Sequence, residues 1–318
     1  MAALHDKTIR RVAVVGTGVI GASWAAYFLA HGLDVDATDP SPGAEARLRE
    51  AVAQHWPTLE RFGLAEGASM DRLRFHPDLE AALRDCDFVQ ENGPERLDFK
   101  IDLFRRMDAA APAHAILASS SSGLRVSDFQ SGCANPQRVV LGHPFNPPHL
   151  IPLVEVIGGE GTSADAVART MDFYAAIGKR PIHVKREVKG HIANRLQAAL
   201  WREAFHLVEQ GVASVADIDT AIAHGPGLRW ALMGPFMNLH LSGGAGGVAH
   251  VLAHLGGPIE DWWKDLGAPT MSEAIKKQVT EGVAAEMGER SLQELESTRD
   301  TLLLNLIRAK AASGTLEA

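Results

Sequence analysis

Cysteine is scarce in this sequence: Cys86 and Cys133 are the only two among 318 residues. They lie far apart and lack the close spacing of zinc ligands, which argues against a disulfide framework and against a zinc site. We expect no resident metal. No apolar run approaches the ~20 residues that cross a bilayer, and residues 1–11 carry neither a signal-peptide nor an Arg-rich targeting pattern. These absences predict a cytoplasmic protein that does not bind membranes.

Long blocks of like charge are also lacking. The formal net charge of −8 is spread along the chain, which argues against a nucleic-acid partner. A hydrophobic content of 46% suffices for one large core or two moderate ones, and we favour two domains, 1–187 and 188–318. Strands and helices alternate in the first, which predicts an α/β fold with a doubly wound parallel sheet. The second reads as almost wholly helical.

A glycine-rich turn near the start of the chain predicts dinucleotide binding. Gly16-Thr17-Gly18-Val19-Ile20-Gly21 follows a β-branched run and precedes a helix-like segment, 22–30. The first glycine permits the tight turn, the second lets backbone amides approach a pyrophosphate, and the third lets helix and strand pack closely. The next strand, 33–38, ends at Asp39, which fits hydrogen bonds from an adenosine ribose and would repel a 2′-phosphate. NAD is therefore favoured over NADP. The expected cofactor contacts are Gly16, Gly18, Val19, Ile20, Gly21 and Asp39.

The remainder of the first domain continues the pattern. Segment 42–76 predicts two helices and contains no lysine, 86–91 a strand, 97–111 an amphipathic helix, and 115–118 a strand that opens into the serine cluster 119–122. Ligands of parallel sheets bind at the carboxyl ends of strands, where this cluster lies. A polar loop with a helix cap is the alternative, and we retain it for Ser119 and Ser121. Thr162 and Asp165 have the spacing of a capping box.

The most informative stretch is LGHPFNPPHLIPLVEVIGG, residues 141–159. It sets His143 between a β-like run and two prolines, and Glu155 inside an apolar run where an unpaired carboxylate is costly. If the segments flanking the prolines fold back on each other, Glu155 orients one ring nitrogen of His143. The other nitrogen is then free to exchange a proton with a substrate. A structural histidine and a solvent-edge glutamate are the alternative.

Three helical features stand out in the second domain. Apolar residues mark one face of a helix over 190–210, and Ser214 with Asp217 forms a capping box for the next one. Near the end, Leu292, Leu295, Leu302 and Leu306 predict a helix with a narrow apolar seam. Such a seam packs within the domain or against a second subunit, and we prefer the second subunit.

Several separated motifs in a fixed order resemble the 3-hydroxyacyl-CoA dehydrogenase superfamily, whose members join a Rossmann-type domain to a helical domain and often dimerise through it. The resemblance extends to about Phe236. Its motifs are the glycine turn with Asp39, Glu95 with Lys100, Ser122, His143-Pro144-Phe145-Asn146-Pro147, Leu153-Val154-Glu155-Val156, Asn194-Arg195 and Gly234-Pro235-Phe236.

The resemblance implies roles for residues at matching positions. His143 would be the catalytic acid/base, Glu155 would orient it, and Ser122 and Asn194 would contact the reacting oxygen. Glu95, Lys100 and Asn146 match positions near the cofactor. The implied activity is NAD-dependent oxidation of the hydroxyl of an L-3-hydroxy acid by a homodimer. Oxidation of a secondary alcohol requires one base and nearby donors, in agreement with this set.

The substrate expected from the resemblance is L-carnitine, the substrate of the branch to which 190–196, 200–204, 227–231 and 297–300 are most similar. L-gulonate and 3-hydroxybutyryl-CoA are the alternatives. A trimethylammonium group needs aromatic faces, and Arg195 is available for a carboxylate, although a structural ion pair is an equally good interpretation. His191 departs from the aromatic residue commoner at this position. The candidate substrate contacts are Phe145, Ile192, Arg195, Trp201 and Trp230.

The alternative function, from a different class, is that of a non-catalytic NAD-binding protein such as a lens crystallin. It predicts loss of His143 or Glu155, and both are present.

Overall fold

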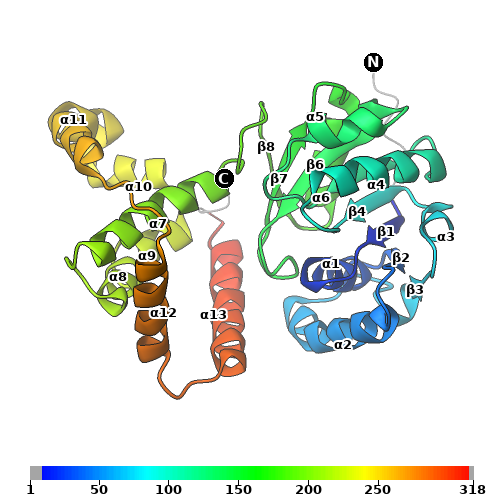
Figure 1. Ribbon diagram of the computed structural model, residues 1–318, viewed down its shortest axis with the longest axis horizontal. Coiled ribbons are helices and arrows are strands. Elements are labelled where there is room, and N and C mark those ends of the chain that lie inside the picture. Colours follow the sequence, from blue (N-terminus) through cyan, green and yellow to red (C-terminus); the bar gives the residue numbers. More distant parts are fainter. Residues whose placement is uncertain (1–8, 315–318) are drawn as a thin grey trace. The chain divides into compact units, whose positions relative to one another are not determined.

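The computed structural model describes residues 9–314. The chain divides into two compact units, Met1–Arg195 and Leu196–Ala318. Figure 1 labels the elements of both. The first unit contains all eight strands, and the second is helical.

The first unit is built on an eight-stranded sheet with the order β3-β2-β1-β4-β5-β6-β7-β8. Its strands are β1 Arg11–Val15, β2 Asp34–Thr38, β3 Leu73–Phe75, β4 Phe88–Glu91, β5 Ile116–Ser119, β6 Val139–Pro144, β7 Leu153–Gly158 and β8 Arg180–His183. Neighbours pair in parallel except β6 with β7. The doubly wound sheet is thus confirmed, with one antiparallel pair inserted where the two prolines turn the chain.

Helices cover both faces of this sheet (Figure 1). They are α1 Val19–Ala30, α2 Ala44–Phe62, α3 Leu79–Leu83, α4 Leu97–Ala110, α5 Val126–Phe129 and α6 Ala164–Ala176. Alternate residues of a strand point to opposite faces. Val12 and Val14 accordingly join the core under α1, α2 and α6, and Ala13 and Val15 join the core under α3, α4 and α5. The central strands β1, β4, β5 and β6 are buried on both faces, which fixes the positions of their ends at the ligand edge.

Two local predictions for this unit are wrong. Segment 42–76 holds one long helix, α2, then a 3₁₀ turn at Met70–Arg72 and strand β3, instead of two helices. The cap of α6 is Ser163, whose hydroxyl accepts the N–H of Ala166. The Thr162 hydroxyl instead donates to the carbonyl of Val139 and accepts from the N–H of Gly159. These two bonds tie the end of β7 to the start of β6, so the Thr162 hydroxyl is not available to cap α6.

The described part of the second unit holds the three helices that the sequence predicts, α7, α8 and α13, together with four more. They are α7 Ala193–Glu209, which starts in the first unit, α8 Val215–Ala223, α9 Pro226–Leu232, α10 Pro235–Ser242, α11 Gly247–Asp265, α12 Glu273–Met287 and α13 Leu292–Ser313. Ser214 and Asp217 form the predicted capping box. Helix α13 coincides with the predicted late helix, but its fully buried leucine is Leu304, and seam residue Leu302 is 62% exposed.

Little of the second unit is buried. Among residues 196–314 the buried hydrophobic side chains are Val208, Val251, Ile275 and Leu304. Large apolar side chains lie at the surface instead, including Phe236, Trp262 and Trp263, which are 81%, 63% and 66% exposed. Exposure on this scale marks an interaction surface. Within the described part of the chain, no helix combines the length and apolarity needed to span a bilayer.

Candidate active site

The glycine turn lies between β1 and α1 and has the geometry expected for an anion. Gly16 has a φ of +86°, in the left-handed region that favours glycine. A Cβ on Gly21 would lie 1.9 Å from the Gly16 carbonyl oxygen, whereas a Cβ on Gly18 would meet nothing within 4 Å. Helix α1 starts there without a side-chain cap and without an acidic residue in its first turn. Its first amides are therefore available to a phosphate.

Asp39 follows β2 at the same edge of the sheet. One carboxylate oxygen accepts the N–H of Thr17 at 2.8 Å, and the other accepts the N–H of Ser41 at 2.8 Å. Burial alone would raise the pKa of Asp39, but these hydrogen bonds outweigh it and hold that pKa below its ordinary value. The carboxylate is thus charged at neutral pH and fixed beside the glycine turn.

His143 and Glu155 meet across the antiparallel pair of β6 and β7. The ring Nδ1 of His143 donates to Glu155 Oε2 at 2.8 Å. A carboxylate accepts only, so Nδ1 carries the hydrogen and Nε2 presents a lone pair. Both side chains are buried, with Glu155 0% and His143 5% exposed. The predicted contact is therefore present, in the orientation that a general base requires.

The second oxygen of Glu155 binds the start of α7. Oε1 accepts the N–H of Ile192 at 2.8 Å and that of Ala193 at 2.9 Å. Burial works to raise the pKa of Glu155, but the hydrogen bonds from His143, Ala193 and Ile192 outweigh it and lower that pKa. The carboxylate stays ionised, so it can stabilise a positive charge formed on His143.

Ser122 and Asn194 also lie together. The side-chain amide of Asn194 donates to the Ser122 carbonyl at 3.5 Å. The Ser122 side chain is exposed and that of Asn194 is half-buried. Ser121 is buried and donates to Glu95 Oε1 at 2.6 Å, which also accepts the N–H of Gly123 at 2.9 Å. Glu95 therefore shapes the loop that presents Ser122.

Lys100 is buried in an ion pair. Its Nζ lies 2.8 Å from both carboxylate oxygens of Glu91, and Ser119 donates to the same carboxylate at 2.6 Å. Glu91 Oε1 also accepts the N–H of Gly93 at 2.6 Å. Ser119 and Ser121 thus take the polar-loop roles retained for them. The Lys100–Glu91 pair holds the loop after β4 next to the glycine turn. The two segments are so close that a Cβ on Gly16 would lie 2.9 Å from the backbone carbonyl of Asn92.

The remaining candidate residues are distributed over both units. The Phe145 ring packs edge-on against His143, with centroids 5.1 Å apart. Asn146 is exposed and precedes a cis proline. Arg195 is exposed and donates to the Lys189 carbonyl at 3.3 Å. Trp201 and Trp230 belong to the second unit and are 51% and 44% exposed.

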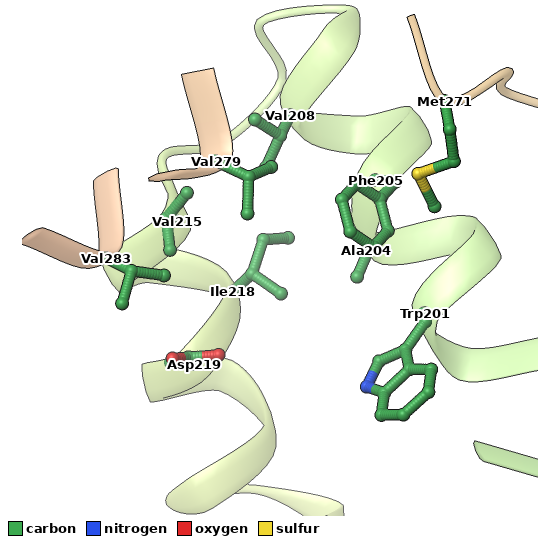
Figure 2. A pocket seen from close by; sticks show the side chains of 10 residues that line it. All are labelled: Trp201, Ala204, Phe205, Val208, Val215, Ile218, Asp219, Met271, Val279 and Val283. Atoms are coloured by element: carbon green, nitrogen blue, oxygen red, sulfur yellow. The ribbon is translucent and has the colours of Figure 1, made fainter. Parts of the chain in front are cut away.

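Trp201 lines a hollow inside the second unit. The hollow has a volume of about 480 Å³, and side chains of α7, α8 and α12 converge on it in Figure 2. Its lining is apolar apart from Asp219, with Phe205 and Ile218 at its centre. Unlike the site around His143, this hollow has no histidine among the described residues that line it.

Three features of the site escape the sequence analysis. Lys179 is buried and donates to the carbonyls of Pro148 and Ile151, within the turn between His143 and Glu155. Ser23 of α1 accepts the N–H of His149 at 2.9 Å and lies 2.9 Å from its Nδ1. The third is the contact of His191 with His143, since the sequence analysis singles out His191 but does not place it beside the base. No local spacing signals these contacts, because each joins distant segments.

Two family models together match most of the chain. A family model for the NAD binding domain of 3-hydroxyacyl-CoA dehydrogenase matches residues 11–188, and the model for the C-terminal domain of that enzyme matches residues 190–278.

Relatives of similar length are found among characterised proteins and solved structures. An L-carnitine dehydrogenase of Streptomyces griseus subsp. griseus is 53% identical over 95% of this chain and 90% of its own. One of Pseudomonas aeruginosa is 50% identical over 95% and 94%. The crystal structure of 5-formyl-3-hydroxy-2-methylpyridine 4-carboxylic acid 5-dehydrogenase, an NAD⁺-dependent dismutase, is 31% identical with a TM-score of 0.83, covering 96% of this chain and 99% of that one.

Proposed function

This chain belongs to the 3-hydroxyacyl-CoA dehydrogenase family, and we propose that it oxidises the 3-hydroxyl of L-carnitine to give 3-dehydrocarnitine. It is an NAD-dependent oxidoreductase. The observation that carries the proposed chemistry is the buried His143–Glu155 pair, with Nε2 of His143 left as the acceptor.

His143 removes the hydroxyl proton. Its Nε2 lone pair accepts that proton as the C3–H bond breaks, and the imidazolium that forms is stabilised by the charged carboxylate of Glu155. The hydroxyl oxygen becomes a carbonyl oxygen, on which negative charge develops during the reaction. Ser122 and Asn194 are the donors that we assign to this oxygen, since they meet on the loop after β5 and the start of α7.

The residues at the sheet edge fit NAD. The uncapped start of α1 and the open space at Gly18 suit a pyrophosphate, and Asp39 suits the ribose hydroxyls while opposing a 2′-phosphate. Val19, 73% exposed, and Ile20 begin α1 beside that space. We assign Glu95, Lys100 and Asn146 to the same region, with Lys100 acting through Glu91. When bound, NAD accepts the hydride from C3.

The choice of L-carnitine rests on the relatives. Those at about half identity over nearly the whole chain are named L-carnitine dehydrogenase, so the substrate is transferred from them. Coenzyme A thioesters are disfavoured because segment 42–76 lacks lysine and three of its five arginines are held in ion pairs. Arg49 pairs with Glu45, and Arg72 and Arg74 pair with aspartates of β2.

A homodimer formed through the helical domain is part of the proposal. Residues 188–318 would supply it, with 1–187 as the NAD-binding domain. The four buried hydrophobic side chains among residues 196–314 are few for an independent core, and exposed tryptophans and methionine suit a subunit interface. The apolar hollow of Figure 2 lies in the same unit. A second copy would cover this surface. The free thiols of Cys86 and Cys133 suit a cytoplasmic location.

The test is NADH formation at mildly alkaline pH, where proton release favours oxidation. L-carnitine, L-gulonate and L-3-hydroxybutyryl-CoA are compared side by side, with H143A as the inactive control. We expect preference for L-carnitine. Preference for either other substrate, with H143A still inactive, would keep the chemistry and reject the substrate. Failure of the wild type on all three would support the non-catalytic alternative.

A further inference from the structure

A second imidazole lies beside the catalytic one. The ring centroids of His191 and His143 are 5.2 Å apart, and His191 is 3% exposed. Its φ of 52° makes it the one non-glycine residue among 9–314 in the left-handed region. The two residues after it donate their N–H groups to Glu155, so the backbone that follows the ring is held in place.

The hydrogen bonds of His191 fix its tautomer. Nε2 lies 3.3 Å from the Ser121 carbonyl oxygen, which can only accept, so Nε2 carries the hydrogen. Nδ1 is left as a lone-pair acceptor, and it is buried without a hydrogen-bond partner among the described residues. Burial first, and then the neighbouring His143, lower the pKa of His191. The ring is therefore uncharged at neutral pH, and the lone pair of Nδ1 has no hydrogen-bond donor within residues 9–314.

Substrate geometry brings both charged groups of L-carnitine within reach of this ring. The reacting oxygen must lie about 3 Å from Nε2 of His143. The ammonium nitrogen and the carboxylate carbon are each two bonds from C3, about 2.5 Å away. Because the ring of His191 lies next to that of His143, we place it beside one of these two groups.

The chemistry of His191 decides which group it is. A carboxylate needs donors, and the single donor of this ring is already used on Ser121. A carboxylate beside Nδ1 would meet a lone pair, which is repulsive. We propose that His191 is a specificity-determining residue on the quaternary-ammonium side of the substrate, where it favours a cation over a neutral group of the same shape. This inference rests on the proposed function.

The mechanism is electrostatic. A neutral imidazole with a fixed tautomer is a dipole, and in a buried site a dipole acts on a nearby cation with little screening. The ionisable groups that act on this ring are His143, Glu155 and Glu95. Protonation of His191 would replace the attraction by repulsion, so the preference for a cation should weaken in acid.

The test compares L-carnitine with its carbon isostere of the same handedness, 3-hydroxy-5,5-dimethylhexanoate, in which a tert-butyl group replaces trimethylammonium. The quantity measured is the ratio of kcat/KM for the two substrates. H191L fills similar space with neither a ring nor an acceptor, and H191N tolerates the left-handed backbone and keeps an acceptor oxygen. H183L, at an exposed histidine of β8, is the matched control.

We expect H191L to lower the carnitine-to-isostere ratio about tenfold, the size of one lost interaction with a charge in a buried site, while kcat/KM for the isostere changes by less than about twofold on the same reasoning. H191N should retain part of the preference, and H183L all of it. An unchanged ratio in H191L, or an equal fall for both substrates, would overturn the inference. Wild-type turnover of L-carnitine tests the proposed function separately. If the wild type oxidises neither compound, both the proposed function and this inference are wrong.

Discussion

His143 and Glu155 are directly opposite each other in the register of β6 and β7. Opposed residues of an antiparallel pair point to the same face, so the backbone alone brings the two side chains together. A slip of one residue would turn Glu155 to the other face of the sheet. The pairing of a base with its orienting carboxylate is therefore set by strand register, and several predictions depend on it.

Replacing His143 by alanine should lower kcat by about 10²–10⁴-fold, the usual contribution of a general base. NADH binding, measured by fluorescence titration, should change little, because His143 makes none of the contacts at the glycine turn. H183A serves as the control at an exposed site. Retention of near wild-type kcat in H143A would remove His143 from the mechanism.

Glu155→Gln should change both catalysis and the pH dependence of stability. The folded-state pKa of Glu155 is lower than its ordinary value of 4.5. Its contribution to stability is thus complete above about pH 4.5 and is lost as pH falls through the lower, folded-state pKa. Denaturant unfolding of wild type and E155Q from pH 7 to pH 3 measures this. The stability difference should shrink in acid, and a constant difference would contradict the shift.

Asp39→Asn should raise KM for NAD by about 10- to 100-fold, the range for loss of charge-assisted hydrogen bonds. The same change should improve relative use of NADP, because the carboxylate no longer repels a 2′-phosphate. Steady-state kinetics with both cofactors give the ratio. The idea that Asp39 selects NAD fails if that ratio is unaltered.

Lys179→Met should destabilise the fold by about 1–3 kcal/mol, because it leaves the Pro148 and Ile151 carbonyls without their donor. Methionine matches the length of the side chain, so the effect reports the lost hydrogen bonds and the lost contact with Tyr27, whose ring centroid lies 3.7 Å from Nζ. K277M, at an exposed lysine of α12, should be neutral. Equal unfolding free energies for the two variants would show that the buried lysine is dispensable.

Substitution of both Trp262 and Trp263 by serine should shift the proposed dimer to monomer in sedimentation velocity, since exposed tryptophans are the expected anchors of an interface. V212S, at another exposed apolar site of the same unit, is the comparison. A dimer that survives the double substitution would place the interface elsewhere.

The sequence predicts the strands, the glycine turn and the His143–Glu155 contact because each depends on local pattern. Val12 to Val15 are apolar throughout, as a strand buried on both faces must be. Strand β3 is not predicted, because its three residues, Leu-Arg-Phe, are too few to show the alternation of apolar and polar side chains that marks a strand. Its existence depends on pairing with β2.

The sequence also does not show which residues from distant segments contact each other. Lys100 is placed near the cofactor by motif, but only the fold shows it buried on Glu91. Lys179 looks like any lysine before a strand, and the carbonyls it binds come from a turn about 30 residues earlier, a contact that no periodicity encodes. The N-cap of α6 shifts from Thr162 to Ser163 because Thr162 is recruited by Val139 across the sheet end.

Glu155 also has a consequence for how this enzyme can change. Its Oε1 occupies the N–H groups of Ile192 and Ala193, so the carboxylate that orients the base is also the anion at the N-terminus of α7. Selection for catalysis and selection for a folded helix therefore act on one side chain. Loss of His143 alone would leave Oε2 of Glu155 buried without its donor, which is costly. A lineage that abandons the reaction therefore has a structural reason to keep both residues, and their presence alone does not demonstrate activity.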